Sequence, residues 1–332
     1  MRNGTLRHGD VVEVASAAEI LATLDEQGKL DGLPFMPEML QYCGRRFTVD
    51  KRAEKLCDTI HYTGSRRLPD SVLLEDLRCD GSGHDGCQAA CRLFWKEAWL
   101  RRVEGETVAA GPTDGTAAAA LSELTARNAR RIADGASNAG VRYQCQATEL
   151  TAATERLQLW DPRAYVREYT SGNVPLRRFL RVVTRAAVEE PLRKLGLMPE
   201  IHLPGTRTEA APEPVLNLRP GEWVRVKSKE EIATTLTPQG RNRGLWFDRE
   251  MLPYCGGTFR VRSRIRNFID DHTGKMIELK TEAVTLEGVV CSGDLSLRRW
   301  FCPRAIYPYW RESWLERVSA QVASAGTAPQ AR

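Results

Sequence analysis

An internal repeat is the feature that most constrains how this chain of 332 residues can fold. Three stretches of the N-terminal third recur in the same order near the C-terminus, and about half of the positions between residues 9 and 49 are identical in the two copies. Each copy spans roughly 95 residues, which is long enough to bury a core of its own. The sequence therefore predicts two copies of one domain. The matching stretches are residues 9–14 with 221–226, 38–44 with 250–256, and 94–103 with 309–318.

Each copy has the pattern of several short strands with one short helix. Residues 11–14 and 223–226 alternate between apolar and polar side chains, as half-buried strands do. Ser16 and Ser228 can each cap a helix that has acidic residues in its first turn. The turn at Thr273-Gly274 predicts a β-hairpin in the second copy. Five or six short strands with an inserted helix indicate a small barrel, so the predicted fold class is mainly β with α insertions (α+β).

The opening of each copy resembles the small SH3-like barrels found in KOW modules and in the β subunit of nitrile hydratase. In those barrels a Gly-acid turn leads into a first strand rich in Val, as Gly9-Asp10-Val11 and Gly221-Glu222-Trp223 do here. The resemblance implies two homologous SH3-like small barrels joined by a helical segment. The glycine pattern of KOW modules is not evident, and no catalytic residue is carried over.

The composition between and after the repeats predicts the remaining divisions of the chain. A Gly-, Thr- and Ala-rich stretch and a region of helical spacing separate the two repeats, and three prolines mark a linker before the second repeat. The predicted divisions are residues 1–104, a Cys-rich first SH3-like repeat; 105–205, a helical connecting segment in which 141–150 is a candidate extra strand of the first barrel; 206–220, a Pro-rich linker; 221–318, the second SH3-like repeat; and 319–332, a disordered tail.

The cysteines suggest a metal site in the first repeat. Nine cysteines without an export signal fit a reduced chain, for which we expect a cytoplasmic location. Thiolates bind zinc, and four of them can hold an iron–sulfur cluster, which is the alternative cofactor. In the second repeat Ile269 and Ile306 replace two of the cysteines, and buried thiols are the alternative in both repeats. The candidate metal ligands are Cys57, Cys79, His84, Cys87 and Cys91.

Four arginines are candidates for binding a partner. They lie at helical spacing and can contact phosphates or an acidic protein. The alternative is a solvated face of an amphipathic helix whose apolar face, formed by Leu176, Phe179, Leu180 and Val183, packs inward. The candidate arginines are Arg177, Arg178, Arg181 and Arg185.

The functional prediction follows from the motifs that are missing as well as from those present. The net charge of +5 permits a nucleic-acid partner without requiring one, and no apolar run is long enough to span a membrane. No phosphate loop, nucleophile elbow or Rossmann fingerprint occurs. Glu97 and Glu312, inside the Trp-x-x-x-Trp motifs, are more typical of solvent-facing strand residues, or of residues paired with a nearby arginine, than of catalytic acids. The leading prediction is a non-catalytic binding or accessory (scaffold) protein that has a protein partner and a metal-stabilised N-terminal barrel. The alternatives are a zinc or iron–sulfur protein whose cysteine cluster is itself redox-active or catalytic, and a nucleic-acid-binding protein.

Overall fold

The computed structural model describes residues 5–103, 115–132, 140–158, 161–197, 203–207, 216–295 and 299–319. Its contacts divide the chain into two compact units. Unit 1 comprises residues 1–179 together with Asn267–Ile277 and Phe301–Arg304. Unit 2 comprises the rest of the chain. The boundary after Phe179 falls inside the helix Leu176–Lys194, and the two short segments of the second repeat just named belong to unit 1. The predicted Pro-rich linker and disordered tail lie largely outside the described residues.

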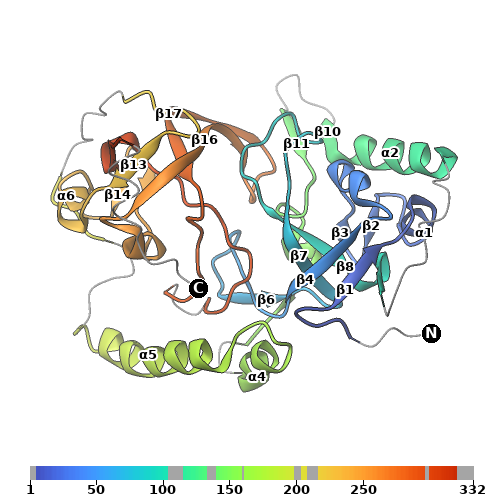
Figure 1. Cartoon of the computed structure of the whole chain (residues 1–332), viewed down its shortest axis with the longest axis horizontal. Coiled ribbons are helices and arrows are strands. Elements are labelled where there is room, and N and C mark those ends of the chain that lie inside the picture. Colours follow the sequence, from blue (N-terminus) through green and yellow to red (C-terminus); the bar gives the residue numbers. More distant parts are fainter. Residues whose placement is uncertain are drawn as a thin grey trace. The chain divides into compact units, whose positions relative to one another are not determined.

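Short strands outnumber helices among the described elements, as the pattern of the repeats predicts (Figure 1). The elements up to the long helix are β1 (Val11–Val14), α1 (Ala17–Leu21), β2 (Lys29–Leu30), β3 (Leu33–Pro34), η1 (Pro37–Tyr42), β4 (Arg46–Arg52), β5 (Leu56–Cys57), β6 (Ser65–Arg67), β7 (Ser71–Arg78), β8 (Arg92–Lys96), η2 (Glu97–Trp99), β9 (Leu100–Arg102), α2 (Gly115–Ala129), β10 (Arg130–Ile132), β11 (Val141–Tyr143), α3 (Leu150–Ala153), β12 (Glu155–Arg156), α4 (Pro162–Thr170) and α5 (Leu176–Lys194). The second repeat has β13 (Trp223–Val226), α6 (Lys229–Ala233), β14 (Arg241–Asn242), β15 (Leu245–Trp246), η3 (Arg249–Tyr254), β16 (Thr258–Ile269), β17 (Met276–Leu286), η4 (Glu312–Trp314) and β18 (Leu315–Arg317).

Each repeat forms a curled, half-barrel sheet. The first has the order β8-β7-β4-β1-β9, and the second has the order β17-β16-β13-β18. The registers agree position by position: Val12 faces Phe47 in the first sheet, as Val224 faces Phe259 in the second. Even the β7–β8 pairing has a counterpart in the bridge between Val284 and Trp310. The equivalences drawn from the sequence can therefore be used residue by residue.

The same aromatic side chains fill the core of each sheet. Phe35 meets Trp99 edge-on at a centroid distance of 5.2 Å, and in the second repeat Phe247 meets Trp314 at 5.3 Å. All four rings are buried. The indole N–H of Trp99 donates to the Thr23 hydroxyl at 3.0 Å, so the polar edge of the ring is satisfied within the core. Trp99 and Trp314 are thus packing residues of the two cores.

The helix starts and the hairpin turn, which depend on contacts between near neighbours in the sequence, are confirmed. Ser16 caps α1 in a capping box with Glu19, and Ser228 does the same for α6. Asp161 caps α4 ahead of its N1 proline. The hairpin between β16 and β17 turns at Gly274, whose φ of 68° suits glycine.

Three findings about the connecting segment and the helices differ from, or add to, the expectations from sequence. Residues Val141–Tyr143 form a strand, but they pair with β10 in a two-stranded sheet and not with the first barrel sheet. The apolar residues Leu176, Leu180 and Val183 of α5 are exposed, so their predicted inward packing is wrong, whereas Phe179 is half-buried and stacks on Phe301. Among the described helices, none has the length and apolarity required to cross a membrane.

Glu97 and Glu312 have the structural role that the sequence favours. Glu97 forms an ion pair with Arg52, and at the equivalent positions Glu312 lies 3.2 Å from Arg264. Glu312 also accepts three backbone N–H groups, from residues 216–218. Charge-assisted hydrogen bonds of this kind contribute to the stability of the fold.

Candidate metal centre

A glutamate on η1 and a loop after β7 meet in the first repeat. Pro37 occupies the first position of η1, where its missing N–H costs nothing, and Glu38 follows it. The loop begins at Cys79, directly after β7, and winds tightly because the N–H groups of His84 and Gly86 both donate to the carbonyl of Gly81. Gly81 has a φ of +77°, and a Cβ there would lie 2.1 Å from the carbonyl oxygen of Cys87. Glycine is therefore required for this loop to close.

This loop brings a thiol and an imidazole to the same carboxylate oxygen. The Cys79 thiol donates to Glu38 Oε1 at 2.7 Å, and His84 Nδ1 lies 3.1 Å from that oxygen. The side chains of Glu38 and His84 are each only 1% exposed. In the part of the chain that the structure describes, these are the only three His, Cys, Asp or Glu residues whose ligand atoms all lie within 4.8 Å of one another.

The orientation of His84 leaves one ring nitrogen for a ligand. Its Nε2 lies 3.1 Å from the backbone carbonyl of Gln144, which fixes Nε2 as a donor. Nδ1 is then the nitrogen available to a metal ion, and a backbone carbonyl behind a ligating histidine is the usual outer contact of such sites. Glu38 Oε2 is buried and has no hydrogen-bond partner among the described residues, so the carboxylate also has an unused acceptor.

The charges of the three groups are interdependent. Burial by itself would raise the pKa of Glu38, but His84 and the Cys79 hydrogen bond lower it below its ordinary value. Burial would likewise lower the pKa of His84, and Glu38 reverses this. Burial and the adjacent Glu38 raise the pKa of the Cys79 thiol far above its usual range. The shifts of Glu38 and His84 therefore favour their charged, paired forms, and the shift of Cys79 favours its thiol over the nucleophilic thiolate.

The second repeat holds the equivalent carboxylate with backbone and hydroxyl donors. Glu250, the counterpart of Glu38, accepts hydrogen bonds from the N–H and hydroxyl of Ser292 at 3.0 and 2.7 Å, and from the N–H of Leu295 at 2.7 Å. Each of its oxygens therefore has a donor. The glutamate contacts the loop that begins at the equivalent cysteine in both repeats, but residues 291–302 of the second repeat contain no histidine.

The other predicted ligands do not join the group of ligand atoms that lie within 4.8 Å of one another. The Cys57 N–H donates to Cys302 Sγ at 3.1 Å, and the Ile269 N–H donates to Cys87 Sγ at 3.4 Å. Burial and Asp271 raise the pKa of Cys91 to about 12, and the Cys91 carbonyl accepts from the Cys79 N–H at 2.8 Å. The structure thus brings the ligand atoms of Cys79 and His84 together and leaves those of Cys57, Cys87 and Cys91 outside that group. No disulfide joins any of the nine cysteines.

A buried arginine lies beside Cys57. Arg304 is 5% exposed and its Nη1 lies 3.9 Å from Cys57 Sγ, while its Nη2 lies 3.5 Å from Asp271. Burial opposes its charge, but the neighbouring thiols and Asp271 raise the pKa of Arg304 above its ordinary value. The group beside the Cys57 sulfur is therefore a permanent cation, which cannot act as a metal ligand.

Glu38 is the site residue that was not predicted from the sequence. It lies 41 residues from Cys79, so no spacing motif connects them. A signal was nevertheless present, because Glu38 and Glu250 are acidic residues retained in both copies of an otherwise apolar Met-Leu-x-Tyr-Cys-Gly stretch. An acid kept in an apolar setting indicates a buried partner.

The arginines predicted to bind a partner lie on α5. Arg177 and Arg181 are exposed, whereas Arg178 and Arg185 are half-buried. Their role as a binding stripe stays a prediction.

Comparisons with protein-family models, with curated proteins and with solved structures found no match to this chain.

Proposed function

We propose that the chain is a non-catalytic binding protein whose first repeat is stabilised by a zinc ion held by Glu38, Cys79 and His84. One observation carries the proposal: a buried carboxylate oxygen without a partner among the described residues lies in a site where the neighbouring groups are a thiol and an imidazole. Carboxylate, thiolate and imidazole are the three ligand types that zinc accepts together.

The donor set favours zinc over the alternative metals. A single thiol in a compact group does not match the four cysteines that hold an iron–sulfur cluster. Calcium and magnesium take oxygen ligands and do not bind sulfur. The three ligand atoms lie within 4.8 Å of one another, and zinc bonds of about 2.0 to 2.3 Å can join them after small rotations of the side chains.

The ion would act on structure rather than on a substrate. It would tie the loop that begins at Cys79 to η1, as the hydrogen bonds of Ser292 tie the matching loop to η3 in the second repeat. The site is enclosed, since Glu38 and His84 are buried, and a closed site is typical of structural zinc. Binding would displace the thiol proton, and its free energy would add to the stability of the fold.

A binding role also fits the rest of the described chain. Glu97 and Glu312 are held by arginines, and burial raises the pKa of the Cys43 and Cys255 thiols to about 11, so none of these groups is prepared for acid–base or nucleophilic chemistry.

The test is the metal content of the full-length protein purified without chelators. We expect one zinc per chain and a colourless protein. Glu38→Gln and His84→Asn should each lose the zinc, whereas the matched variant Glu250→Gln in the second repeat should keep it. A folded wild-type protein without zinc would overturn the proposal, as would a brown protein containing iron.

A further inference from the structure

The solvent face of β16 carries arginines at every second position. Because side chains alternate along a strand, residues 260, 262, 264 and 266 share one face, at intervals of about 7 Å. The intervening Val261 and Ile265 are fully buried, which identifies the arginine face as the outer one. All of these residues belong to unit 2, and Figure 1 shows β16 between β13 and β17.

Two of the four arginines stack on aromatic rings. The Arg260 guanidinium lies 5.6 Å from the centre of the Trp223 ring, and Arg262 lies 4.4 Å from that of Tyr307. Neither has a carboxylate within 4.0 Å among the described residues. By contrast, Arg264 pairs with Glu282 and Glu312. Arg260 and Arg262 therefore present positive charge that no acid in the described part of unit 2 neutralises.

The first repeat shows that the fold does not need this arrangement. Thr48 and Asp50 occupy the positions of Arg260 and Arg262, and Val11 occupies that of Trp223. Where the second repeat has Arg262 on Tyr307, the first has an ordinary ion pair between Asp50 and Arg92 at 2.5 Å.

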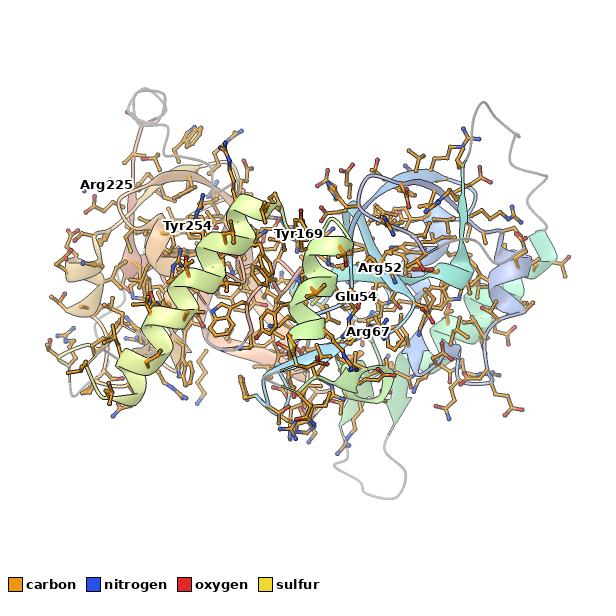
Figure 2. The ribbon with its side chains drawn as sticks, turned by 90° about the horizontal axis from the view of Figure 1, so that it is seen from below. Arg52, Glu54, Arg67, Tyr169, Arg225 and Tyr254 are labelled. Atoms are coloured by element: carbon orange, nitrogen blue, oxygen red, sulfur yellow. The ribbon has the colours of Figure 1, made fainter. Side chains whose placement is uncertain are left out.

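Further along the same strand face both repeats carry ion pairs. Arg266 pairs with Glu282, and its counterpart Glu54 pairs with Arg52 and Arg67 (Figure 2). The contrast between the two faces is therefore confined to Arg260 and Arg262, which lie against aromatic rings and have no acidic partner among the described residues.

We propose that the outer face of β16 in the second repeat binds single-stranded nucleic acid. The uncompensated guanidinium groups would contact phosphates, and nucleobases would stack on the guanidinium and ring planes. A single strand is favoured over a duplex because its bases expose their faces, whereas a duplex buries them in its own stack.

The inference rests on the proposed binding role, for which it names the partner class, and it does not depend on the metal ion. Glu38→Gln is therefore expected to lose zinc without losing nucleic-acid binding by a folded protein. The double variant Arg260→Ala/Arg262→Ala is expected to keep zinc and to lose binding. The two proposals can fail separately.

The experiment is fluorescence anisotropy of full-length protein with labelled dT and rU oligomers across a salt series. The double variant should weaken binding at least about 10-fold and reduce the salt slope by about 1.4, since each single-strand phosphate contact contributes about 0.7. The control Arg46→Ala/Arg101→Ala removes two arginines that pair with Glu13 in the first repeat, and it should change affinity less than about 2-fold.

A second variant separates stacking from charge. Trp223→Val copies the first repeat, and it should weaken binding about 3-fold or more while leaving the salt slope unchanged. No binding at low salt would overturn the proposal. So would equal losses in the two double-arginine variants, or equally tight binding of an acidic polypeptide such as polyglutamate.

Discussion

Glu38 Oε1 lies 3.1 Å from Nδ1 of His84, and both side chains are almost completely buried. An acid and an imidazole in such a position either form a buried ion pair or share a metal ion. The Oε2 atom, which has no partner among the described residues, and the adjacent Cys79 thiol favour the metal ion.

The loop that holds Cys79 and His84 should not accept a side chain at Gly83. A Cβ there would lie 2.6 Å from Glu38 Oε2 and 2.9 Å from the Pro37 ring. Gly83→Ala should therefore displace the carboxylate, lower zinc occupancy and destabilise the protein by about 1 to 3 kcal/mol. The control is Gly115→Ala, because nothing lies within 4 Å of a Cβ at that position. Zinc analysis and urea unfolding measure both effects, and full zinc occupancy in Gly83→Ala would contradict the geometry.

We expect the ion pair between Arg52 and Glu97 to contribute only to the free energy of unfolding. Arg52 is 4% exposed and also lies 3.1 Å from Glu54 (Figure 2). Its loss would remove the cation that pairs with Glu97 and would leave Glu54 with Arg67 and Arg167. We expect Arg52→Ala to lower the free energy of unfolding by about 3 to 5 kcal/mol. Arg101→Ala removes an exposed pair and should cost less than about 1 kcal/mol. Equal unfolding midpoints of the two variants in urea would show that the buried pair is not stabilising.

Stability should fall as the pH rises through neutrality because of Glu168. Burial raises the pKa of Glu168 to about 8 from an ordinary 4.5, against the opposing effects of the Asn173 hydrogen bond and the Lys55 charge. Between these two values the folded chain retains a proton that the unfolded chain has lost, so each rise in pH favours unfolding.

The variant Glu168→Gln removes this titration. It should match the wild type near pH 4.5 and exceed its free energy of unfolding near pH 8. Urea unfolding at both pH values measures this difference, with Glu155→Gln, an exposed acid, as the control. A wild-type protein and a Glu168→Gln variant with the same pH dependence would show that Glu168 is ionised in the fold.

The parts of the fold that the sequence predicts well are those determined by near neighbours. Ser16, Ser228 and Asp161 cap helices through donors two or three residues away, and the Gly274 turn requires only a positive φ. The internal repeat adds information about contacts between distant residues, because the tryptophans that recur in both copies are buried in both.

The metal centre could be predicted only in part. Cys79 and His84 belong to one short loop and are visible as a motif, but Glu38 reaches them through the packing of η1 against that loop. Cys57 and Cys87 lie instead against Cys302 and Ile269, residues so distant along the chain that spacing does not reveal the contacts.

The exposed face of α5 is the part of the fold for which the sequence was misleading. Leu176 and Leu180 recur at helical spacing, yet both are exposed. Helical periodicity identifies an apolar face without showing what covers it.

The zinc content of three full-length proteins, measured side by side by elemental analysis, is the most direct test of the metal centre. We expect one zinc per chain in the wild type and in Glu250→Gln, and none in Glu38→Gln. Glu250 is the matched control because it holds the equivalent loop through Ser292 and Leu295, and that loop contains no histidine. Zinc retained at full occupancy by a folded Glu38→Gln variant, or absent from all three proteins, would contradict the proposed centre.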